Sequence, residues 1–260
     1  MNEQRRSGRQ ARTAERSRKG PGVGRPYITR NIPTYDILSE ENLLKIEAAA
    51  DRILAETGIE FRDDPVALDH WKRAGAKVEG LLVRFEPGML REILRSAPAE
   101  FTQHARNPAH SVRIGGKNVV FSPAYGSPFV MDLDKGRRFG TLEDFRNFIR
   151  LAQASPNFHH SGGTICEPTD IPVNKRHLDM VMAHIELSDR PFMGSVTAEE
   201  RSEDSIEMCR ILFGADFVDA NCTILGNVNV NSPLVWDGTM TRSLRAYARA
   251  NQAAVVVPFI

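Results

Sequence analysis

Hydrophobic and polar positions alternate most regularly near the carboxyl end of the chain. An apolar run at Cys222–Leu225 is followed by a polar loop, Gly226–Trp236, and by a helical pattern over about Gly238–Asn251. A second apolar run, Ala254–Phe259, comes directly after that helix. Two buried strands joined by a helix of this length form a βαβ unit. The loop after the first strand of such a unit lies where parallel α/β proteins bind ligands.

The same succession of strands and helices begins near residue 140. Thr141 is placed to cap a helix that reaches Ala154. The next predicted elements, strand and helix in turn, are Phe158–Gly162, His177–Ser188, Pro191–Gly194 and Ala198–Phe213. Four strands thus follow residue 155, and each but the last precedes a helix. This order predicts a (β/α) barrel or an open parallel sheet.

The first part of the chain follows a different pattern. Ser39 is placed to cap a long helix that Gly58 ends, and Asp64–Pro65 starts a second, shorter helix. Short predicted strands come after it, up to about residue 115. We therefore expect an α+β lead-in over residues 31–115, without a catalytic constellation, packed on a main body over residues 116–260.

The length of that main body limits the architecture. A complete eightfold (β/α)8 TIM barrel needs about 250 residues, whereas residues 116–260 supply 145. The chain stops on the apolar run VVVPFI, with no helix after it. A final strand of this kind leaves an exposed edge. The fold class expected is therefore α/β, an incomplete TIM barrel with about half of its strands, present as the amino-terminal portion of a longer protein.

Composition places the chain among ordinary globular proteins. Hydrophobic residues make up 41% and charged residues 26% of its 260 residues. No apolar run approaches the roughly 20 residues of a membrane span, and the amino terminus lacks the apolar segment of a secretory signal. Cys166, Cys209 and Cys222 are too widely spaced for a disulfide framework or a zinc knuckle. These features favour a cytoplasmic location without membrane contact.

Charge is concentrated at the amino terminus. Residues 1–30 carry nine Arg and Lys against Glu3 and Glu15, a net charge of +7, so the remaining residues carry −6 of the overall +1. Large apolar residues are almost absent there, which predicts a disordered basic tail over residues 1–30. Nucleic-acid binding and an organellar transit peptide are the two alternatives. The tail lacks interleaved aromatics and is weakly amphipathic, so neither is preferred, and no nucleic-acid partner is expected.

Candidate site residues lie in the segments that follow the predicted strands. Tyr125 sits in the turn 122–127, where its ring can line a pocket or only shield the turn. In the segment 159–170, His160 can face the mouth of a barrel, and Thr164 and Glu167 follow it. Glu167 either faces a cationic substrate or is solvated in its loop. The histidine and acidic spacing there matches no standard metal site, so no metal is expected.

The polar loop near the carboxyl end supplies the remaining candidates. Asn227, Asn229 and Asn231 alternate with valines, so they share one face if the segment is extended. Such a face can hydrogen-bond a carboxylate, whereas a turn rich in asparagine is the equally weighted alternative. Asp237 either caps the following helix or lies near a cationic substrate. Ser195 or Thr197 is expected to cap the helix Ala198–Phe213.

Two separate stretches resemble a known family. NVNVNSPLVWDGTM with LRAYARANQAAVVVPF, and RPYITRNIPTYDILSEENL with ETGIEF, resemble the trimethylamine methyltransferase (MttB-like) family. The resemblance covers nearly all of residues 25–260. It implies a TIM barrel of about twice this length that transfers a methyl group from a methylated amine, such as trimethylamine or glycine betaine, to a Co(I) corrinoid. The corrinoid is supplied by a partner protein, so no cofactor is bound directly.

The resemblance also limits what this chain contains. The catalytic residues, and the pyrrolysine of trimethylamine-specific members, are expected in the missing carboxyl-terminal part. A homo-oligomer is expected for the full-length protein. A noncatalytic half-barrel that binds a ligand or a complementary chain is the second hypothesis, and an unrelated TIM-barrel hydrolase or lyase is the third.

Overall fold

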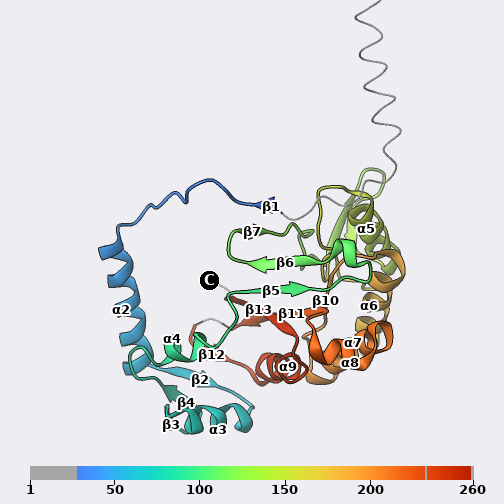
Figure 1. Cartoon of the computed structure of the whole chain (residues 1–260). Coiled ribbons are helices and arrows are strands. Elements are labelled where there is room, and N and C mark those ends of the chain that lie inside the picture. The colour runs from blue at the N-terminus through green and yellow to red at the C-terminus, as the bar shows by residue number, and fades with distance from the viewer. Residues whose placement is uncertain (1–27, 232, 259–260) are drawn as a thin grey trace, which may run out of the picture.

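The computed structural model describes residues 28–231 and 233–258 of the chain, which form a mixed α/β structure with several small sheets (Figure 1). The predicted disordered tail, residues 1–30, lies outside the described residues except for its last three. Of these, Ile28–Thr29 form β1, which pairs antiparallel with β7 (Asn118–Val119).

A parallel three-stranded sheet lies at the centre of the main body. It contains β10 (Phe192–Gly194), β11 (Ile224–Val230) and β13 (Ala253–Pro258), and these strands are neighbours in their order along the chain. The connections between them include α7 (Glu199–Phe213) and α9 (Gly238–Arg249). The predicted βαβ unit is therefore present, with both of its strands in parallel register.

Backbone hydrogen bonds continue this order beyond β10. Ser161 N donates to Pro191 O and Met193 N donates to Gly162 O, each at 2.9 Å. The predicted strand at Phe158–Gly162 is nevertheless wrong as a regular strand, because none is formed there. Gly162 has a φ of 98°, which only glycine adopts readily, and this breaks the extended backbone. Helix α5 (Leu142–Ala154) precedes the segment 158–162, and α6 (Arg176–Leu187) connects that segment to β10.

Helices α7 and α9 cover one face of the sheet and form the main core with it. Tyr247 of α9 is fully buried and packs with Ile224 and Val228 of β11. Its ring lies directly over two strand glycines. A Cβ at Gly194 would come within 2.5 Å of the Tyr247 hydroxyl, and a Cβ at Gly226 within 2.7 Å of the ring. The side chains of even-numbered residues of β11 therefore face the helices, and those of odd-numbered residues face away.

The segment after Leu225 differs from the sequence prediction. β11 runs on to Val230, so the first residues of the predicted polar loop, 226–230, belong to the strand. The alternation of asparagine and valine is the period-two pattern of a strand with two different faces, and it extends a parallel ladder with the three valines of β13. Further on, Val235–Trp236 form β12, which pairs with β2 (Ile59–Phe61) of the amino-terminal region.

The amino-terminal region contains both helices and short strands, and its sheet includes β12 from much later in the chain. Its four-stranded sheet has the order β12-β2-β4-β3. Ser39 and Asp64 cap α2 and α3 with their side chains, and Gly58 follows α2 with a φ of 82°. The elements of the region are α2 (Glu40–Glu56), β2 (Ile59–Phe61), α3 (Pro65–Ala74), β3 (Lys77–Glu79), β4 (Leu82–Arg84), α4 (Met89–Leu94), β5 (Glu100–Gln103), the short 3-10 helix η1 (Pro108–His110) and β6 (Val112–Gly115).

Near the start of the main body lies a hairpin of β8 (Phe129–Asp132) and β9 (Gly136–Phe139). Thr141 then starts α5 through a capping box with Asp144. A short helix, α8 (Ala215–Ala220), follows α7 and was not predicted.

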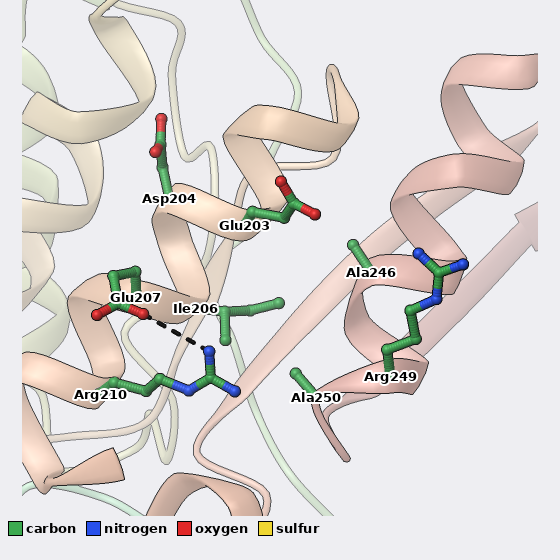
Figure 2. A pocket seen from close by; sticks show the side chains of 8 residues that line it. All are labelled: Glu203, Asp204, Ile206, Glu207, Arg210, Ala246, Arg249 and Ala250. Atoms are coloured by element: carbon green, nitrogen blue, oxygen red, sulfur yellow. Dashed lines mark ion pairs between the residues drawn. The ribbon is translucent and has the colours of Figure 1, made fainter.

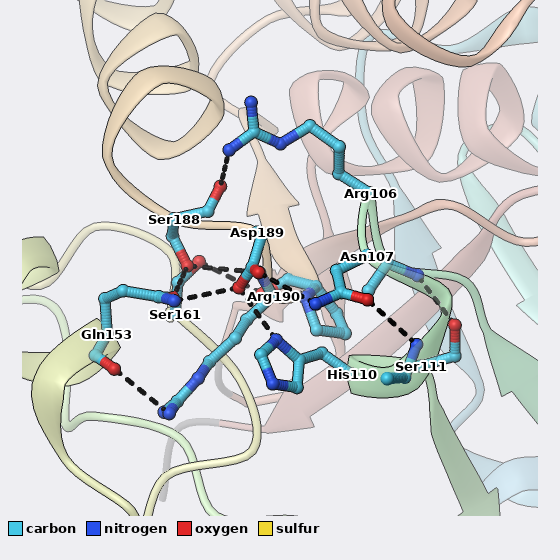
Figure 3. A network of polar contacts seen from close by, with 12 residues as sticks. Arg106, Asn107, His110, Ser111, Gln153, Ser161, Ser188, Asp189 and Arg190 are labelled. Atoms are coloured by element: carbon cyan, nitrogen blue, oxygen red, sulfur yellow. Dashed lines mark hydrogen bonds and ion pairs between the residues drawn. The ribbon is translucent and has the colours of Figure 1, made fainter. Parts of the chain in front are cut away.

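A polar network joins the amino-terminal region to the beginning of β10 (Figure 3). Asp189 accepts hydrogen bonds from Asn107 at 3.0 Å and from Gln153 at 2.8 Å, and its other close contact is His110 Nδ1 at 2.7 Å. The neighbouring Arg190 is buried, and its guanidinium donates to four backbone carbonyls around the end of α5. These contacts satisfy the carbonyls that a helix end leaves without partners.

Across residues 28–231 and 233–258, no sheet closes on itself into a barrel. The structure therefore shows a mixed α/β fold with a parallel sheet. No helix within this part of the chain is both long enough and apolar enough to cross a membrane.

Candidate functional site

Backbone contacts join several of the segments that carry the candidate residues. Gly126 N donates to Thr164 O at 2.8 Å, which joins the segment containing Tyr125 to the one containing Thr164. Gly194 of β10 is paired in register with Gly226 of the neighbouring strand β11. Tyr125 and Thr164 thus lie on adjacent segments, and Asn227 and Asn229 lie towards the carboxyl end of β11, the end of a parallel sheet at which ligands usually bind.

His160 is a buried, neutral hydrogen-bond donor at this edge. Its side chain is 1% exposed, and its Nδ1 accepts a hydrogen bond from Gly162 N at 2.9 Å. Burial, with a smaller effect from the neighbouring His184, lowers the pKa of His160 to about 3. A neutral ring that accepts at Nδ1 carries its proton on Nε2. That Nε2 has no hydrogen-bond partner among the residues that the structure describes.

His184 of α6 holds the same segment from the helix side. Its Nε2 donates to Gly163 O at 3.1 Å, so in the neutral ring Nδ1 accepts from the Ser161 hydroxyl at 2.9 Å. Burial lowers the pKa of His184 to about 4, which keeps this tautomer at neutral pH. His184 was not recognised from the sequence, because its partner lies 23 residues earlier.

The asparagines of β11 lie on the face of the sheet away from α9. Gly226 faces Tyr247, so Asn227 and Asn229 face the other side, where they are paired in register with Val255 and Val257 of β13. Asn227 Oδ1 is buried without a hydrogen-bond partner among the described residues. Asn231 is exposed and forms an isolated antiparallel bridge with Val235.

The remaining candidates have more ordinary surroundings. Tyr125 is 42% exposed, and Thr164 is half-buried. Glu167 forms an ion pair with Arg176 at the start of α6, so its charge is already compensated. Asp237 caps α9 by accepting from Met240 N at 2.9 Å, which confirms the capping alternative for this residue.

Comparison with known proteins identifies the family. A sequence model described as trimethylamine methyltransferase (MTTB) matches residues 5–260. The chain belongs to this family.

Two curated relatives of this methyltransferase family are also similar to the chain. The glycine betaine methyltransferase of Desulfitobacterium hafniense (strain Y51) is 46% identical over 230 residues, which cover 88% of this chain and 48% of the relative. The proline betaine:corrinoid methyltransferase of Eubacterium limosum is 27% identical over 182 residues, which cover 67% of this chain and 35% of the relative. The chain thus spans about half the length, or less, of the relatives it matches.

The prediction that Ser195 or Thr197 caps α7 is wrong. The helix begins after Ala198, which makes no side-chain cap. The hydroxyls of Ser195 and Thr197 instead lie 3.1 Å from each other, and Thr197 accepts from Arg201. The first-turn residues Glu199 and Glu200 still provide negative charge near the positive end of the helix dipole.

A hollow on the surface of the described residues lies outside the candidate site. It has a volume of about 400 Å³ and lies between α7 and α9, lined by Glu203, Asp204, Glu207, Arg210 and Arg249 over a floor of smaller side chains (Figure 2). These helices separate it from the face that carries Asn227. Among the described residues, no three His, Cys, Asp or Glu side chains converge as a metal site requires.

Proposed function

We propose that this chain contributes the substrate-binding edge of a methyltransferase that transfers a methyl group from a methylated amine, of the betaine type, to a Co(I) corrinoid held by a partner protein. Membership of the trimethylamine methyltransferase family, together with 46% identity to a protein named glycine betaine methyltransferase, is the observation that carries the proposal. The second relative is named as a proline betaine:corrinoid methyltransferase, which supports the corrinoid as acceptor.

The architecture that we propose for the main body is part of a TIM barrel. Neighbouring parallel strands in sequence order, with connecting helices packed on one face, are the pattern of a (β/α)8 fold. The hydrogen bonds from residues 161–162 to residues 191–193 extend this pattern by one further segment. On this view, the face of the sheet that carries Asn227 is the inner face of the barrel.

The proposed substrate has two ends that the candidate residues can recognise. A quaternary ammonium group is attracted to the face of an aromatic ring, and Tyr125 provides a partly exposed ring beside Thr164. A carboxylate accepts hydrogen bonds, and the side-chain amides of Asn227 and Asn229 on the inner face, together with Nε2–H of His160, are donors. Glu167 is less suited to bind the cation, since Arg176 already compensates its charge.

The role of these residues is to bind and orient the methyl donor. The C–N bond to the transferred methyl group breaks, its electron pair stays on the amine nitrogen, and the product amine loses its positive charge. The corrinoid supplies the acceptor for the methyl group when the partner protein brings it to this edge. Holding the methyl carbon in line with its acceptor accounts for a large part of the rate enhancement in a transfer of this kind. The chain's polar residues contribute that alignment.

The activity is tested by mixing the purified chain with a Co(I) corrinoid protein and, separately, glycine betaine, proline betaine and trimethylamine. We expect methyl-cobalt absorbance to develop with a betaine, and to fall at least tenfold in rate for Asn227→Ala. Asn147→Ala, which removes an exposed asparagine on α5, is the matched control and should retain the wild-type rate. Equal rates for the two variants would show that Asn227 is not part of the binding site.

A noncatalytic function is the second candidate, and the position of β13 at the edge of its sheet favours it. In this case the chain binds a ligand or a complementary chain and turns nothing over. Absence of methyl-cobalt absorbance with all three amines, together with saturable binding of glycine betaine by calorimetry, would support this candidate.

A further inference from the structure

The hairpin of β8 and β9 has one exposed face that is largely apolar. Its register pairs Phe129 with Phe139 and Met131 with Arg137, so these four side chains lie on the same face. Met131 and Phe139 are 76% and 58% exposed, and Leu133, in the turn between the two strands, is fully exposed. We call these five residues the hairpin face.

The opposite side of the hairpin fixes it to the body. Val130 is buried and belongs to a core with Phe145 and Ile149 of α5. Arg138, which is paired with Val130 in the register, donates to both carboxylate oxygens of Asp144, at 2.5 and 2.7 Å. A two-point contact of this kind fixes orientation as well as distance. The hairpin is therefore held in place without using the side chains of the hairpin face.

The side chains of the hairpin face also contact one another. The rings of Phe129 and Phe139 lie with centroids 4.7 Å apart, and the Arg137 guanidinium lies 3.7 Å from the centre of the Phe129 ring. Aromatic and arginine side chains contribute most strongly to binding at protein interfaces when they are fixed in place. Apolar side chains gathered on an exposed surface mark an interaction site. The hairpin face thus has the composition of a protein-binding surface with one cation.

This surface lies beside the candidate site. The hairpin directly precedes α5, and the helix of a βα unit begins at the carboxyl end of the strand before it. Ser127, just before β8, forms a parallel bridge with Cys166, and Gly126 N donates to Thr164 O at 2.8 Å. The base of the hairpin is therefore joined to the segments that carry Tyr125 and Thr164. Any protein that brings a reactant to these segments approaches from the end where the hairpin lies.

We propose that the hairpin face is a docking surface for the protein that carries the corrinoid, an inference that rests on the proposed methyl transfer. The cobalt must come close to the methyl donor, so its carrier has to cover the carboxyl ends of the strands and can contact the hairpin at the same time. The surface it presents should be apolar, with a carboxylate for Arg137. A second copy of the chain fits less well, because a copy bound here would obstruct the approach of the corrinoid.

Binding is tested by calorimetry with a methyl-accepting corrinoid protein of Eubacterium limosum, the source of the second relative. We expect saturable 1:1 binding that Met131→Ser/Leu133→Ser weakens at least about tenfold, because interface affinity is concentrated in a few central side chains. Leu151→Ser/Ile211→Ser is the matched control. It removes two apolar side chains from α5 and α7 that are 65% and 79% exposed, and it should leave the Kd unchanged.

The charge of the hairpin face is tested separately. Arg137→Glu should weaken binding and should make the remaining affinity less sensitive to salt, because an attractive ion pair with the partner is lost. Circular dichroism of each variant alone verifies that the chain remains folded. A loss of affinity with an unchanged spectrum then belongs to the surface and not to the fold.

A second acceptor distinguishes docking from methyl transfer. Free cob(I)alamin needs no protein surface, so Met131→Ser/Leu133→Ser should leave the rate of methyl-cobalt formation with it unchanged. With subsaturating corrinoid protein, the same variant should lower the rate at least about tenfold, in proportion to its affinity. If no methyl group reaches either acceptor, the proposed function fails, whereas the calorimetry still decides whether the hairpin face binds the corrinoid protein.

Three results would overturn the proposal. The first is the absence of binding to the corrinoid protein at micromolar concentrations. The second is equal affinity of the wild-type chain and Met131→Ser/Leu133→Ser. The third is self-association of the chain that this variant abolishes, which would assign the hairpin face to a second copy.

Discussion

Arg245 of α9 and Asp64 at the start of α3 form a buried ion pair with 2.7 Å between Nη1 and Oδ2, although 181 residues separate them in the chain. Asp64 also caps α3 through Ala67 N and accepts a hydrogen bond from the Thr241 hydroxyl at 2.6 Å. Burial opposes ionisation of Asp64, but the hydrogen bonds from Arg245, Thr241 and Ala67 outweigh it and hold the pKa of the carboxyl below its usual value. This carboxylate fixes the amino-terminal region to the helix that covers the parallel sheet.

Replacing Asp64 should therefore destabilise the whole chain. Asp64→Ala leaves Arg245 largely buried without its counter-ion and removes the cap of α3, so we expect a loss of about 3–5 kcal/mol in the free energy of unfolding. Urea unfolding followed by circular dichroism measures it. Asp69→Ala breaks an exposed ion pair with Arg73 on the same helix and should cost under about 1 kcal/mol. Similar losses for both variants would contradict the role assigned to Asp64.

The buried histidines His160 and His184 predict a specific pH dependence of stability. Their pKa values in the folded chain, about 3 and about 4, lie below the value of about 6.5 for an unfolded histidine. As the pH falls below 6.5 the unfolded chain binds protons that the folded chain does not, so stability decreases until the pH reaches the folded-state pKa. Each residue should remove about 2 kcal/mol between pH 7 and pH 5.

This dependence is measured by urea unfolding at pH 7, 6 and 5. His184→Gln keeps a hydrogen-bonding side chain that cannot titrate. The decrease in the free energy of unfolding between pH 7 and pH 5 should therefore be smaller by the contribution of one histidine. An unchanged decrease in the variant would show that His184 is protonated in the folded chain.

The contact between Tyr247 and the strand glycines predicts that β11 cannot accept even a methyl group at position 226. Gly226→Ala places a Cβ about 2.7 Å from the ring, and we expect a loss of about 1–3 kcal/mol. Thermal unfolding of Gly226→Ala, Tyr247→Leu and the double variant forms a cycle that isolates this contact. The double variant should be more stable than the sum of the two single losses implies, because the smaller side chain leaves room for the methyl group. Simple additivity would show that the strain arises elsewhere.

Arg190 should be essential for the end of α5. Its guanidinium donates to the carbonyls of Ala152, Gln153, Ser155 and Phe158, at distances between 2.5 and 3.1 Å. Arg190→Lys keeps the charge but cannot present the planar set of donors, so we expect a loss of about 2–4 kcal/mol. The corresponding change on the surface, Arg150→Lys, should be close to neutral, since Arg150 is 44% exposed. Hydrogen exchange near residues 150–158 should increase in Arg190→Lys alone.

Much of the fold could be predicted because its signals are local. Thr141, Ser39 and Asp64 are helix caps that act within three residues, and all three were identified from the sequence. Asp237 belongs to the same class. The order of strands and helices after residue 155 also follows from local periodicity, which is why the parallel sheet was expected.

The errors have a different physical origin. The polar loop was predicted to begin at Gly226, with an extended segment and a turn as equal alternatives for Asn227 and Asn229, and pairing of β11 with β13 decides for the extended segment. The break at Gly162 depends on a side-chain acceptor, His160, that no periodicity reveals. Arg190 and His184 hold segments that lie far from them in sequence, so only the folded chain shows their contacts.

Strand β12 places the segment that follows the asparagines in the sheet of the amino-terminal region. Val235 and Trp236 pair with Glu60 and Phe61, and the Trp236 and Phe61 rings stack with centroids 6.4 Å apart. A shift of that small sheet would thus be transmitted directly to Asn231 and to the start of α9. Under the proposed function, substitutions near position 60 would therefore alter the binding face through Asn231 without any contact to the ligand.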